Sequence, residues 1–240
     1  MDLSGKVAVV TGASSGLGRA FSLALHHEGM TVFGLARRKE RLDEMAKVLG
    51  ERFVAVACDV TDDQALADAF ALVHKVAGRL DVLVNNAGLG QFGEITDLTT
   101  EQIDVQLGTN VRGLLLATQH AVQVMAAQAR KNGGLGGHVV NIASVAGLVG
   151  NPKLSVYNAT KFAVRGASEA LMKELRPQGI KVTCFFPGSV VTEFADVAGS
   201  KGNEDGMHAE DLAETLVHVL KAPRRYLISE VVMRPMEVKA

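Results

Sequence analysis

The chain has 240 residues, of which 48% are apolar and 21% charged, and its formal net charge is −1. This balance gives no basic footprint for nucleic acid or for an anionic membrane, so we expect neither as a partner. The two cysteines, Cys58 and Cys184, lie far apart in apolar runs, which argues against a disulfide framework or a metal motif. With no signal-peptide pattern, the sequence predicts one globular domain over residues 1–240, located in the cytoplasm.

Short β-branched runs alternate with stretches of helical periodicity along the whole chain. The predicted strands are 7–10, 31–36, 53–58, 81–85, 138–143, 181–186 and 226–233, and the predicted helices are 17–28, 39–49, 62–77, 99–129, 155–176 and 209–221. Continuous apolar strands indicate burial on both faces, which is typical of a parallel sheet covered by helices. We therefore predict a doubly wound α/β fold of the Rossmann type, with a seven-stranded parallel sheet and helices on both faces.

The first predicted strand runs into a glycine-rich loop, TGASSGLG, and then directly into a helix. Gly12, Gly16 and Gly18 permit a tight turn there and let backbone N–H groups approach a pyrophosphate at the positive end of the helix. Their spacing departs from the G-x-G-x-x-G fingerprint. Their position between strand and helix nevertheless predicts a dinucleotide site.

The end of the second predicted strand bears on which dinucleotide is bound. An NAD site usually carries a carboxylate about 20 residues after the glycines, where it bonds the adenosine ribose. Here Arg37 and Arg38 follow the strand, and two guanidiniums suit the 2′-phosphate of NADP. Ser14 offers a hydroxyl to the same phosphate. The alternative is a pair of solvated surface arginines.

Tyr157 and Lys161 are four residues apart in the run YNATK, a spacing that places both on one face of a helix. A nearby positive charge stabilises a phenolate, so a phenol beside a fixed ammonium ion can transfer protons near neutral pH. Taken alone, the pair would be an aromatic residue and a lysine on an amphipathic helix.

The pattern TGxxxGxG resembles the short-chain dehydrogenase/reductase family, and the other motifs of that family follow in order. NNAG (85–88) ends the fourth predicted strand, and Asn110 lies in the next helix. Ser144 ends the fifth strand, 13 residues before Tyr157, and PGSVVT (187–192) follows the sixth. The resemblance covers essentially the whole chain. It implies an oxidoreductase that transfers a hydride between a nicotinamide and a small carbonyl or alcohol substrate.

The resemblance also implies roles for individual residues. Tyr157 would be the general acid/base, Lys161 would lower its pKa and bond the nicotinamide ribose, and Ser144 would hold the substrate oxygen. Asn110 resembles the fourth catalytic member, which kinks its helix and orders a water in a proton relay. The complete set of expected cofactor-binding residues is Gly12, Ser14, Ser15, Gly16, Leu17, Gly18, Arg37, Arg38, Asp59, Val60, Asn86, Ala87, Gly88, Tyr157, Lys161, Pro187, Gly188, Val190 and Thr192.

Within that set, the resemblance assigns parts of the cofactor to short segments. Asp59 and Val60 would meet the adenine, and Pro187–Gly188 would turn the chain under the nicotinamide. The backbone of Val190 and the hydroxyl of Thr192 would then meet its carboxamide. Many NADP-preferring members carry a basic residue where this chain has Ser15, so we expect NADP while use of NAD stays open. The proposed chemistry needs no metal.

The alternatives to this enzyme are a catalytically silent NADP-binding sensor or scaffold, and a dehydratase or epimerase. The presence of both Tyr157 and Lys161 argues against the first. Relatives of the second kind usually carry a separate C-terminal domain. The substrate walls are predicted to be mostly apolar, and their expected residues are Leu89, Phe92, Val145, Leu148, Leu154, Phe194 and Met207. The tail SEVVMRP resembles bacterial NADP-dependent reductases that include 3-hydroxy acid dehydrogenases.

Two further expectations concern mobility and assembly. The polar, glycine-containing stretch 195–206 follows a strand's carboxyl end, where ligands bind in open parallel sheets, and is predicted to form a lid. The long predicted helices 99–129 and 155–176 carry apolar residues on more than one stripe. In the family these helices pair with their copies in a four-helix interface, which implies a homodimer or homotetramer.

Overall fold

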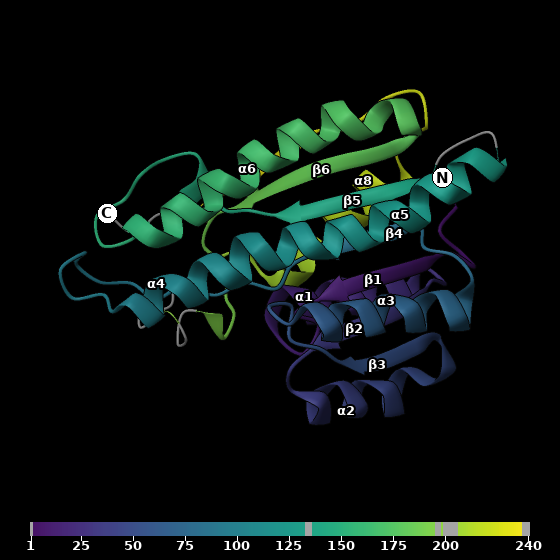
Figure 1. Ribbon diagram of the computed structural model, residues 1–240, viewed down its shortest axis with the longest axis horizontal. Helices are drawn as coiled ribbons and strands as arrows, with labels where there is room; N and C mark the ends of the chain where they lie inside the picture. Colours follow the sequence, from purple (N-terminus) through teal and green to yellow (C-terminus); the bar gives the residue numbers. More distant parts are fainter. Residues whose placement is uncertain (1, 133–135, 195–197, 199–205, 237–240) are drawn as a thin grey trace.

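The computed structural model describes residues 2–132, 136–194, 198 and 206–236. Its strands are β1 (Val7–Thr11), β2 (Thr31–Ala36), β3 (Phe53–Ala57), β4 (Val82–Asn85), β5 (Gly137–Ile142), β6 (Ile180–Pro187) and β7 (Glu230–Met233). Within these residues the strands form one sheet in the order β3-β2-β1-β4-β5-β6-β7, and every neighbouring pair is parallel (Figure 1). The predicted seven-stranded parallel fold is confirmed.

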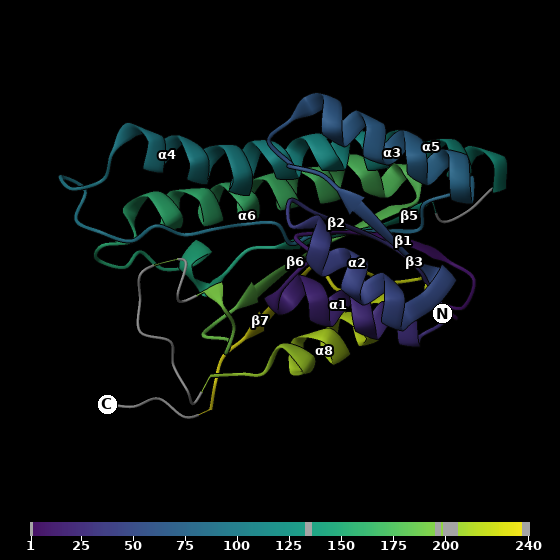
Figure 2. The same cartoon turned by 90° about the horizontal axis from the view of Figure 1, so that it is seen from below.

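Helices cover both faces of the sheet. They are α1 (Gly16–His27), α2 (Lys39–Leu49), α3 (Asp63–Ala77), α4 (Thr100–Leu107), α5 (Leu114–Asn132), α6 (Ser155–Leu175) and α8 (Ala209–Lys221). Figure 2 shows α1, α2 and α8 on one side of the strands and α3, α5 and α6 on the other. Among the helices within the described ranges, none combines the length and the apolar content that crossing a membrane requires.

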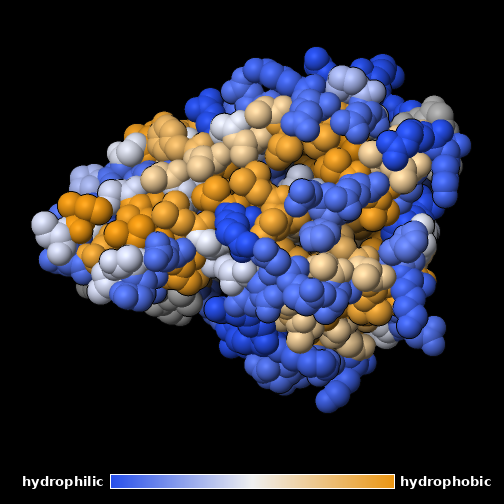
Figure 3. Space-filling view, viewed as in Figure 1, coloured by the Kyte–Doolittle hydropathy of each residue, from blue (hydrophilic) through white to orange (hydrophobic). Residues whose placement is uncertain are grey.

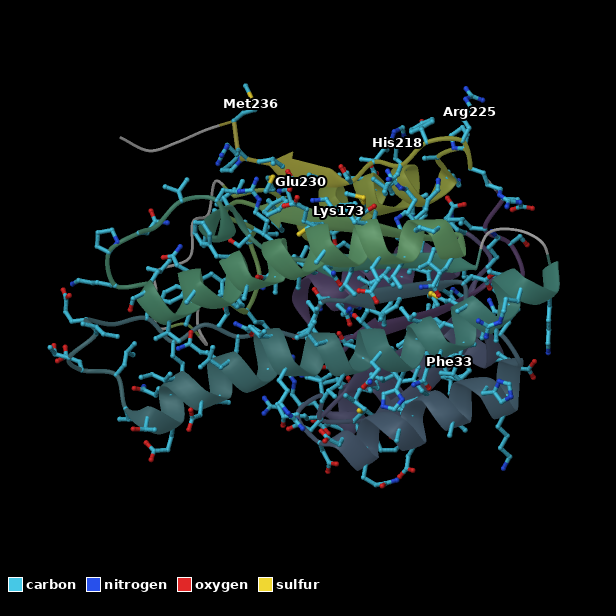
Figure 4. The ribbon with its side chains drawn as sticks, turned by 45° about the horizontal axis from the view of Figure 1, so that its top comes forward. Phe33, Lys173, His218, Arg225, Glu230 and Met236 are labelled. Carbon is cyan, nitrogen blue, oxygen red and sulfur yellow. The ribbon has the colours of Figure 1, made fainter. Side chains whose placement is uncertain are left out.

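Each face of the sheet has its own hydrophobic core. Phe21 of α1 and Leu216 of α8 belong to one cluster, whereas Phe70 of α3 and Ala121 of α5 belong to the other. Phe33 of β2, labelled in Figure 4, is fully buried in the second cluster. β1, β4, β5 and β6, which lie between the two cores, are buried along their whole length, as expected for a sheet covered by helices on both faces.

The last strand is shorter than predicted. Residues 226–229 run beside β6, but the carbonyls of Tyr226 and Ile228 accept hydrogen bonds from the side chains of Lys181 and Thr183. Because these carbonyls are occupied by side chains, the regular ladder with β6 begins only near Glu230. Glu230 also faces α6 (Figure 4), where it pairs with Arg165 at 3.4 Å.

The predicted continuous helix 99–129 is divided. Thr99 caps α4 in a reciprocal pair with Gln102, and a π-helical segment, Gly108–Gly113, then separates α4 from α5. The reason lies in Asn110, whose buried side chain bonds the backbone of Leu89 outside the helix. Short π-helical turns of this kind are frequent at functional sites.

The strand order places the carboxyl ends of β1, β4, β5 and β6 along one edge. After β1 the chain crosses to the face that carries α1, and after β4 it crosses to the other face. Ligands bind at such a change of face, outside the carboxyl ends of the strands. The motif residues Gly12, Asn86, Ser144 and Gly188 all follow these strand ends.

Candidate active site

The glycine-rich loop between β1 and α1 has the backbone that its sequence predicted. Gly12 and Gly16 have φ angles of +69° and +49°, in the region that favours glycine. A Cβ on Gly12 would lie 2.9 Å from Nδ2 of Asn86, and one on Gly18 would collide with the carbonyl of Gly12. Since side chains are excluded here, the backbone at the start of α1 can approach a pyrophosphate closely. The loop therefore fits a dinucleotide.

The end of β1 is tied to the end of β4 by Thr11, which sequence reasoning did not single out. Its Oγ1 accepts hydrogen bonds from the backbone N–H groups of Asn86 and Ala87, each at 3.0 Å. Nδ2 of Asn86 returns a bond to the carbonyl of Thr11, also at 3.0 Å. The threonine that precedes Gly12 in the TG motif was the available signal. These bonds hold residues 86–88 beside the glycine-rich loop.

Arg37 and Arg38 differ sharply in their surroundings. Arg38 donates from Nη2 to Oγ of Ser15 at 2.6 Å and from Nε to Oγ of Ser14 at 3.3 Å. Its Nη1 also lies 3.5 Å from a carboxylate oxygen of Glu193. Arg37 is exposed. The structure therefore brings Arg38, and not Arg37, onto the glycine-rich loop.

Two residues beside Arg38 were missed by sequence reasoning. Arg41 of α2 holds both carboxylate oxygens of Glu193, at 2.8 and 3.0 Å, across 152 residues of sequence. No short-range pattern predicts such a pair. A groove of about 650 Å³ opens beside it, and its lining includes Ser14, Ser15, Arg41 and Glu193.

The expected adenine pair follows β3. Oδ1 of Asp59 accepts bonds from the backbone N–H and the hydroxyl of Thr61, at 2.9 and 2.8 Å. Val60 is buried and lies against Gly113, where an added Cβ would come within 2.8 Å of Cγ2 of Val60. The π-helical segment and the loop after β3 thus support each other.

Asn110 locks the loop that follows β4. Its Nδ2 donates to the carbonyl of Leu89 at 2.7 Å and to Oγ1 of Thr160 at 3.1 Å, and its Oδ1 accepts from the N–H of Leu89 at 2.8 Å. Gly88 lies between Asn110 and Lys161. A Cβ added to Gly88 would be 3.2 Å from Oδ1 of Asn110 and 3.6 Å from Nζ of Lys161. Three of the expected functional residues therefore meet at one point.

Ser144, Tyr157 and Lys161 come together between β5 and α6. Nζ of Lys161 donates to the carbonyl of Ile142 at 2.9 Å and lies 5.6 Å from the centre of the Tyr157 ring. Oγ of Ser144 accepts from the N–H of Ala146 at 3.1 Å and donates to the carbonyl of Pro187 at 3.4 Å. Both Tyr157 and Lys161 are buried.

The acidity of Tyr157 differs from the expectation. The pair with Lys161 was expected to lower its pKa, but burial raises the pKa of Tyr157 to about 12, and the hydrogen bond with Ser144 offsets this only in part. The ammonium group is drawn to the carbonyl of Ile142 rather than to the phenol. Burial also lowers the pKa of Lys161 to about 8.

Asn158 and Thr160, on the helix that carries Tyr157, were also not singled out from the sequence. Asn158 donates to the carbonyls of Ala146 and Val149 and so fixes the loop after Ser144. Thr160 donates to the carbonyl of Tyr157 at 2.8 Å and accepts from Asn110. Both act by positioning their neighbours.

The segment after β6 continues past Gly188, whose N–H donates to the carbonyl of Met233 at 2.8 Å. Met207 then bonds the carbonyl of Ser189 and the N–H of Val191. The backbone groups of Val190 between them are therefore directed away from Met207. Thr192 lies against the glycine-rich loop, since a Cβ on Gly16 would be 3.3 Å from Cβ of Thr192. Pro187 is the last residue of β6, one residue beyond the end of the predicted strand 181–186.

An aromatic cluster surrounds the Tyr157 ring. Phe92 lies 5.4 Å and Phe194 5.7 Å from it, centre to centre, and the two phenylalanines are 6.4 Å apart. Phe92 and Phe194, two of the expected wall residues, therefore lie beside Tyr157. Met207, a third expected wall residue, packs instead against the hydrophobic core that includes residues of α1 and α8. The expected lid, 195–206, lies outside the described residues except for Ala198 and Gly206.

Residues 6–202 match the short chain dehydrogenase family. The chain belongs to this family. This short-chain dehydrogenase is 39% identical to farnesol dehydrogenase of Aedes aegypti, over 98% of each chain. It is therefore an enzyme of the NAD(P)-dependent dehydrogenase/reductase type.

Two solved structures have the same fold as this short-chain dehydrogenase. The 3-ketoacyl-(acyl-carrier-protein) reductase of Brucella melitensis, solved with NADH, is 28% identical with a TM-score of 0.90, covering 98% of both chains. A serine dehydrogenase in a closed form with NADP⁺ is 29% identical with a TM-score of 0.90, covering 98% of this chain and 96% of its own. Relatives thus carry either dinucleotide.

Proposed function

We propose that this enzyme uses NADP(H) to interconvert a small carbonyl compound and its alcohol, with Tyr157 as the general acid/base. The carrying observation is that Ser144, just beyond β5, and Tyr157 and Lys161, one helical turn apart on α6, are all present, with Nζ of Lys161 5.6 Å from the centre of the Tyr157 ring. Burial excludes water from this arrangement, so each polar contact acts strongly there. One domain would carry both the cofactor and the substrate sites.

The bound nicotinamide would supply or accept the hydride, and the protein would handle the proton. Oη of Tyr157 would give a proton to the carbonyl oxygen during reduction and take it from the alcohol during oxidation. Ser144, which follows β5, would hold the same substrate oxygen. Bringing a phenol from a pKa of about 12 to about 7 takes roughly 7 kcal/mol of selective stabilisation of the phenolate. Lys161, with a pKa near 8, is mostly protonated at pH 7 and has the right sign of charge.

The preference for NADP rests on Arg38. Its guanidinium is held by the hydroxyls of Ser14 and Ser15 at the glycine-rich loop, and the two residues that follow β2 in sequence are arginines rather than a carboxylate. A planar guanidinium with neighbouring hydroxyls suits a phosphate group. Use of NAD is the alternative, favoured by the lack of a basic residue at Ser15.

The substrate proposed is an apolar carbonyl or alcohol compound. Phe92 and Phe194 present aromatic surface beside Tyr157. Lys153, a cation that could help to bind a substrate carboxylate, lies 3.5 Å from the carboxylate of Glu94. Among the relatives, this character fits the name farnesol dehydrogenase better than the name serine dehydrogenase.

We further propose a homo-oligomer, a dimer or tetramer, in the cytoplasm. Figure 3 shows apolar residues gathered over the face that carries α4, α5 and α6. Leu107, Leu115 and Phe162 are exposed on this face, each to more than 40%. Both cysteines are unpaired and buried, which suits a reducing compartment.

Tyr157→Phe tests the proposed chemistry, with Tyr226→Phe as the matched control because Tyr226 is the other tyrosine and is exposed. Farnesol, short ketones and 3-hydroxy acids would be assayed through NADPH absorbance. Since general acid/base catalysis contributes about 10²- to 10⁴-fold, Tyr157→Phe should lose at least a hundredfold in kcat, with NADPH affinity within about threefold. A variant that keeps a tenth of the wild-type rate would remove Tyr157 from this role. Turnover on none of these compounds, with normal NADPH binding, would favour the silent sensor.

A further inference from the structure

An anionic side chain already lies between two guanidiniums at the end of the cofactor site. Glu193, from the segment after β6, binds Arg41 through both oxygens and also lies 3.5 Å from Nη1 of Arg38. These contacts with Arg41 and Arg38 lower the pKa of the Glu193 carboxyl, which keeps it ionised near neutral pH. Arg38 and Arg41 therefore already share one carboxylate before any ligand enters.

A 2′-phosphate would need the same two partners. Phosphate and carboxylate are both bound bidentately by arginine, so they compete for one guanidinium. Two anions beside each other repel, and a phosphate monoester carries about −1.5 to −2 charges at pH 7. Neutralising Glu193 would relieve this repulsion.

Arg38 is anchored independently of Glu193. Its Nη2 and Nε bond the hydroxyls of Ser15 and Ser14, whereas its contact with Glu193 is the longest of the three. Removal of the Glu193 charge should therefore leave the Arg38 guanidinium on the glycine-rich loop and release Arg41 to face the same anion.

We propose that Glu193 and Arg41 are specificity-determining residues of the cofactor site, in which the Glu193 carboxylate competes with the 2′-phosphate and restrains the preference for NADP over NAD. This inference rests on the proposed function, in which Arg38 receives the 2′-phosphate. Arg41 is the second guanidinium of the phosphate site, partly neutralised by Glu193.

The test compares adenosine 2′,5′-diphosphate with 5′-AMP by titration calorimetry, because the two differ only in the 2′-phosphate and need no turnover. Two unit charges 4 Å apart in water interact by an amount equivalent to about fivefold in an equilibrium constant. We expect Glu193→Gln to bind the diphosphate about fivefold more tightly, with a gain that shrinks as salt rises. Arg41→Gln should weaken it by a similar factor. Binding of 5′-AMP should stay within about twofold in both variants.

Glu40→Gln is the matched control. Glu40 lies in the same turn of α2 as Arg41, and in the described part of the chain it pairs with neither Arg38 nor Arg41. This variant removes the same charge and should leave both titrations unchanged.

Three results would overturn the proposal. They are unchanged diphosphate affinity in Glu193→Gln, an equal loss of affinity for both nucleotides in Arg41→Gln, and the same gain in diphosphate affinity in Glu40→Gln. The proposed cofactor choice fails separately, if wild type and Glu193→Gln both bind the diphosphate no better than 5′-AMP. A preference that appears only in Glu193→Gln would support the competition.

Discussion

Asn110 should contribute to stability as well as to the site, and the structure allows its contribution to be calculated. Its side chain is 2% exposed and makes three hydrogen bonds, two to the backbone of Leu89 and one to Thr160. At about 1 kcal/mol for each bond, Asn110→Ala should lower the free energy of unfolding by about 3 kcal/mol. The N–H and C=O of the partly buried Leu89 would be left without these partners.

Thr160→Val isolates one of the three bonds. Valine is nearly isosteric with threonine, and this substitution removes one of the three hydrogen bonds of Asn110. It also removes the bond from the Thr160 hydroxyl to the carbonyl of Tyr157. The double variant should therefore be less destabilised than the sum of the single variants, by about 1 kcal/mol.

Urea unfolding followed by far-UV circular dichroism measures these free energies, at one fixed protein concentration because assembly adds to stability. A loss below about 0.5 kcal/mol in Asn110→Ala would refute the locking role of Asn110. Strict additivity in the double variant would show that the Asn110–Thr160 bond contributes nothing.

Two other predictions concern charge. His138 is buried, and burial, followed by the charge of Lys181, lowers its pKa to about 3. The pKa of His138 in the folded protein therefore lies below its unfolded value of about 6.5. Its contribution to the free energy of unfolding is complete above pH 6.5 and is lost as the pH falls toward 3. His138→Gln should remove a slope of about 1.4 kcal/mol per pH unit from urea unfolding between pH 6 and 4, and an unchanged slope would contradict the shift. Arg38→Ala should weaken NADPH binding at least tenfold and leave NADH binding unchanged, because a charge-assisted bond contributes about 1.5–3 kcal/mol. Arg37→Ala serves as the control for Arg38→Ala, because Arg37 is exposed. The double variant Arg37→Asp, Arg38→Ala should prefer NADH over NADPH. Equal losses of NADH and NADPH affinity in Arg38→Ala would mean that Arg38 only supports the fold.

The fold was predictable because its signals are local and repeated. β1, β4, β5 and β6 are rich in β-branched and other apolar residues, and each is buried along its whole length. The errors fall where a side chain replaces a backbone partner. Lys181 and Thr183 bond the carbonyls that would otherwise start β7 early, and Asn110 accompanies the π-helical turn in the predicted helix 99–129.

The candidate site was predictable as a set of positions but not in its electrostatics. Motif spacing selected Ser144, Tyr157 and Lys161, and their role in catalysis stays a prediction. It could not give the direction of the Tyr157 pKa, because burial depends on rings such as Phe92 and Phe194 that come from distant segments. It also missed Arg41 and Glu193, since an ion pair across 152 residues leaves no periodic signal.

Thr192, Glu193 and Phe194 are consecutive, yet each touches a different part of the enzyme. Thr192 lies on Gly16, Glu193 holds Arg41, and Phe194 packs on the Tyr157 ring. One short stretch of backbone therefore carries contacts to both the cofactor site and the substrate site. If displacement of Glu193 changes the contact of Phe194 with Tyr157, then a substrate that contacts Phe194 must change the affinity for the adenosine end of the cofactor by the same factor, because such linkage is reciprocal.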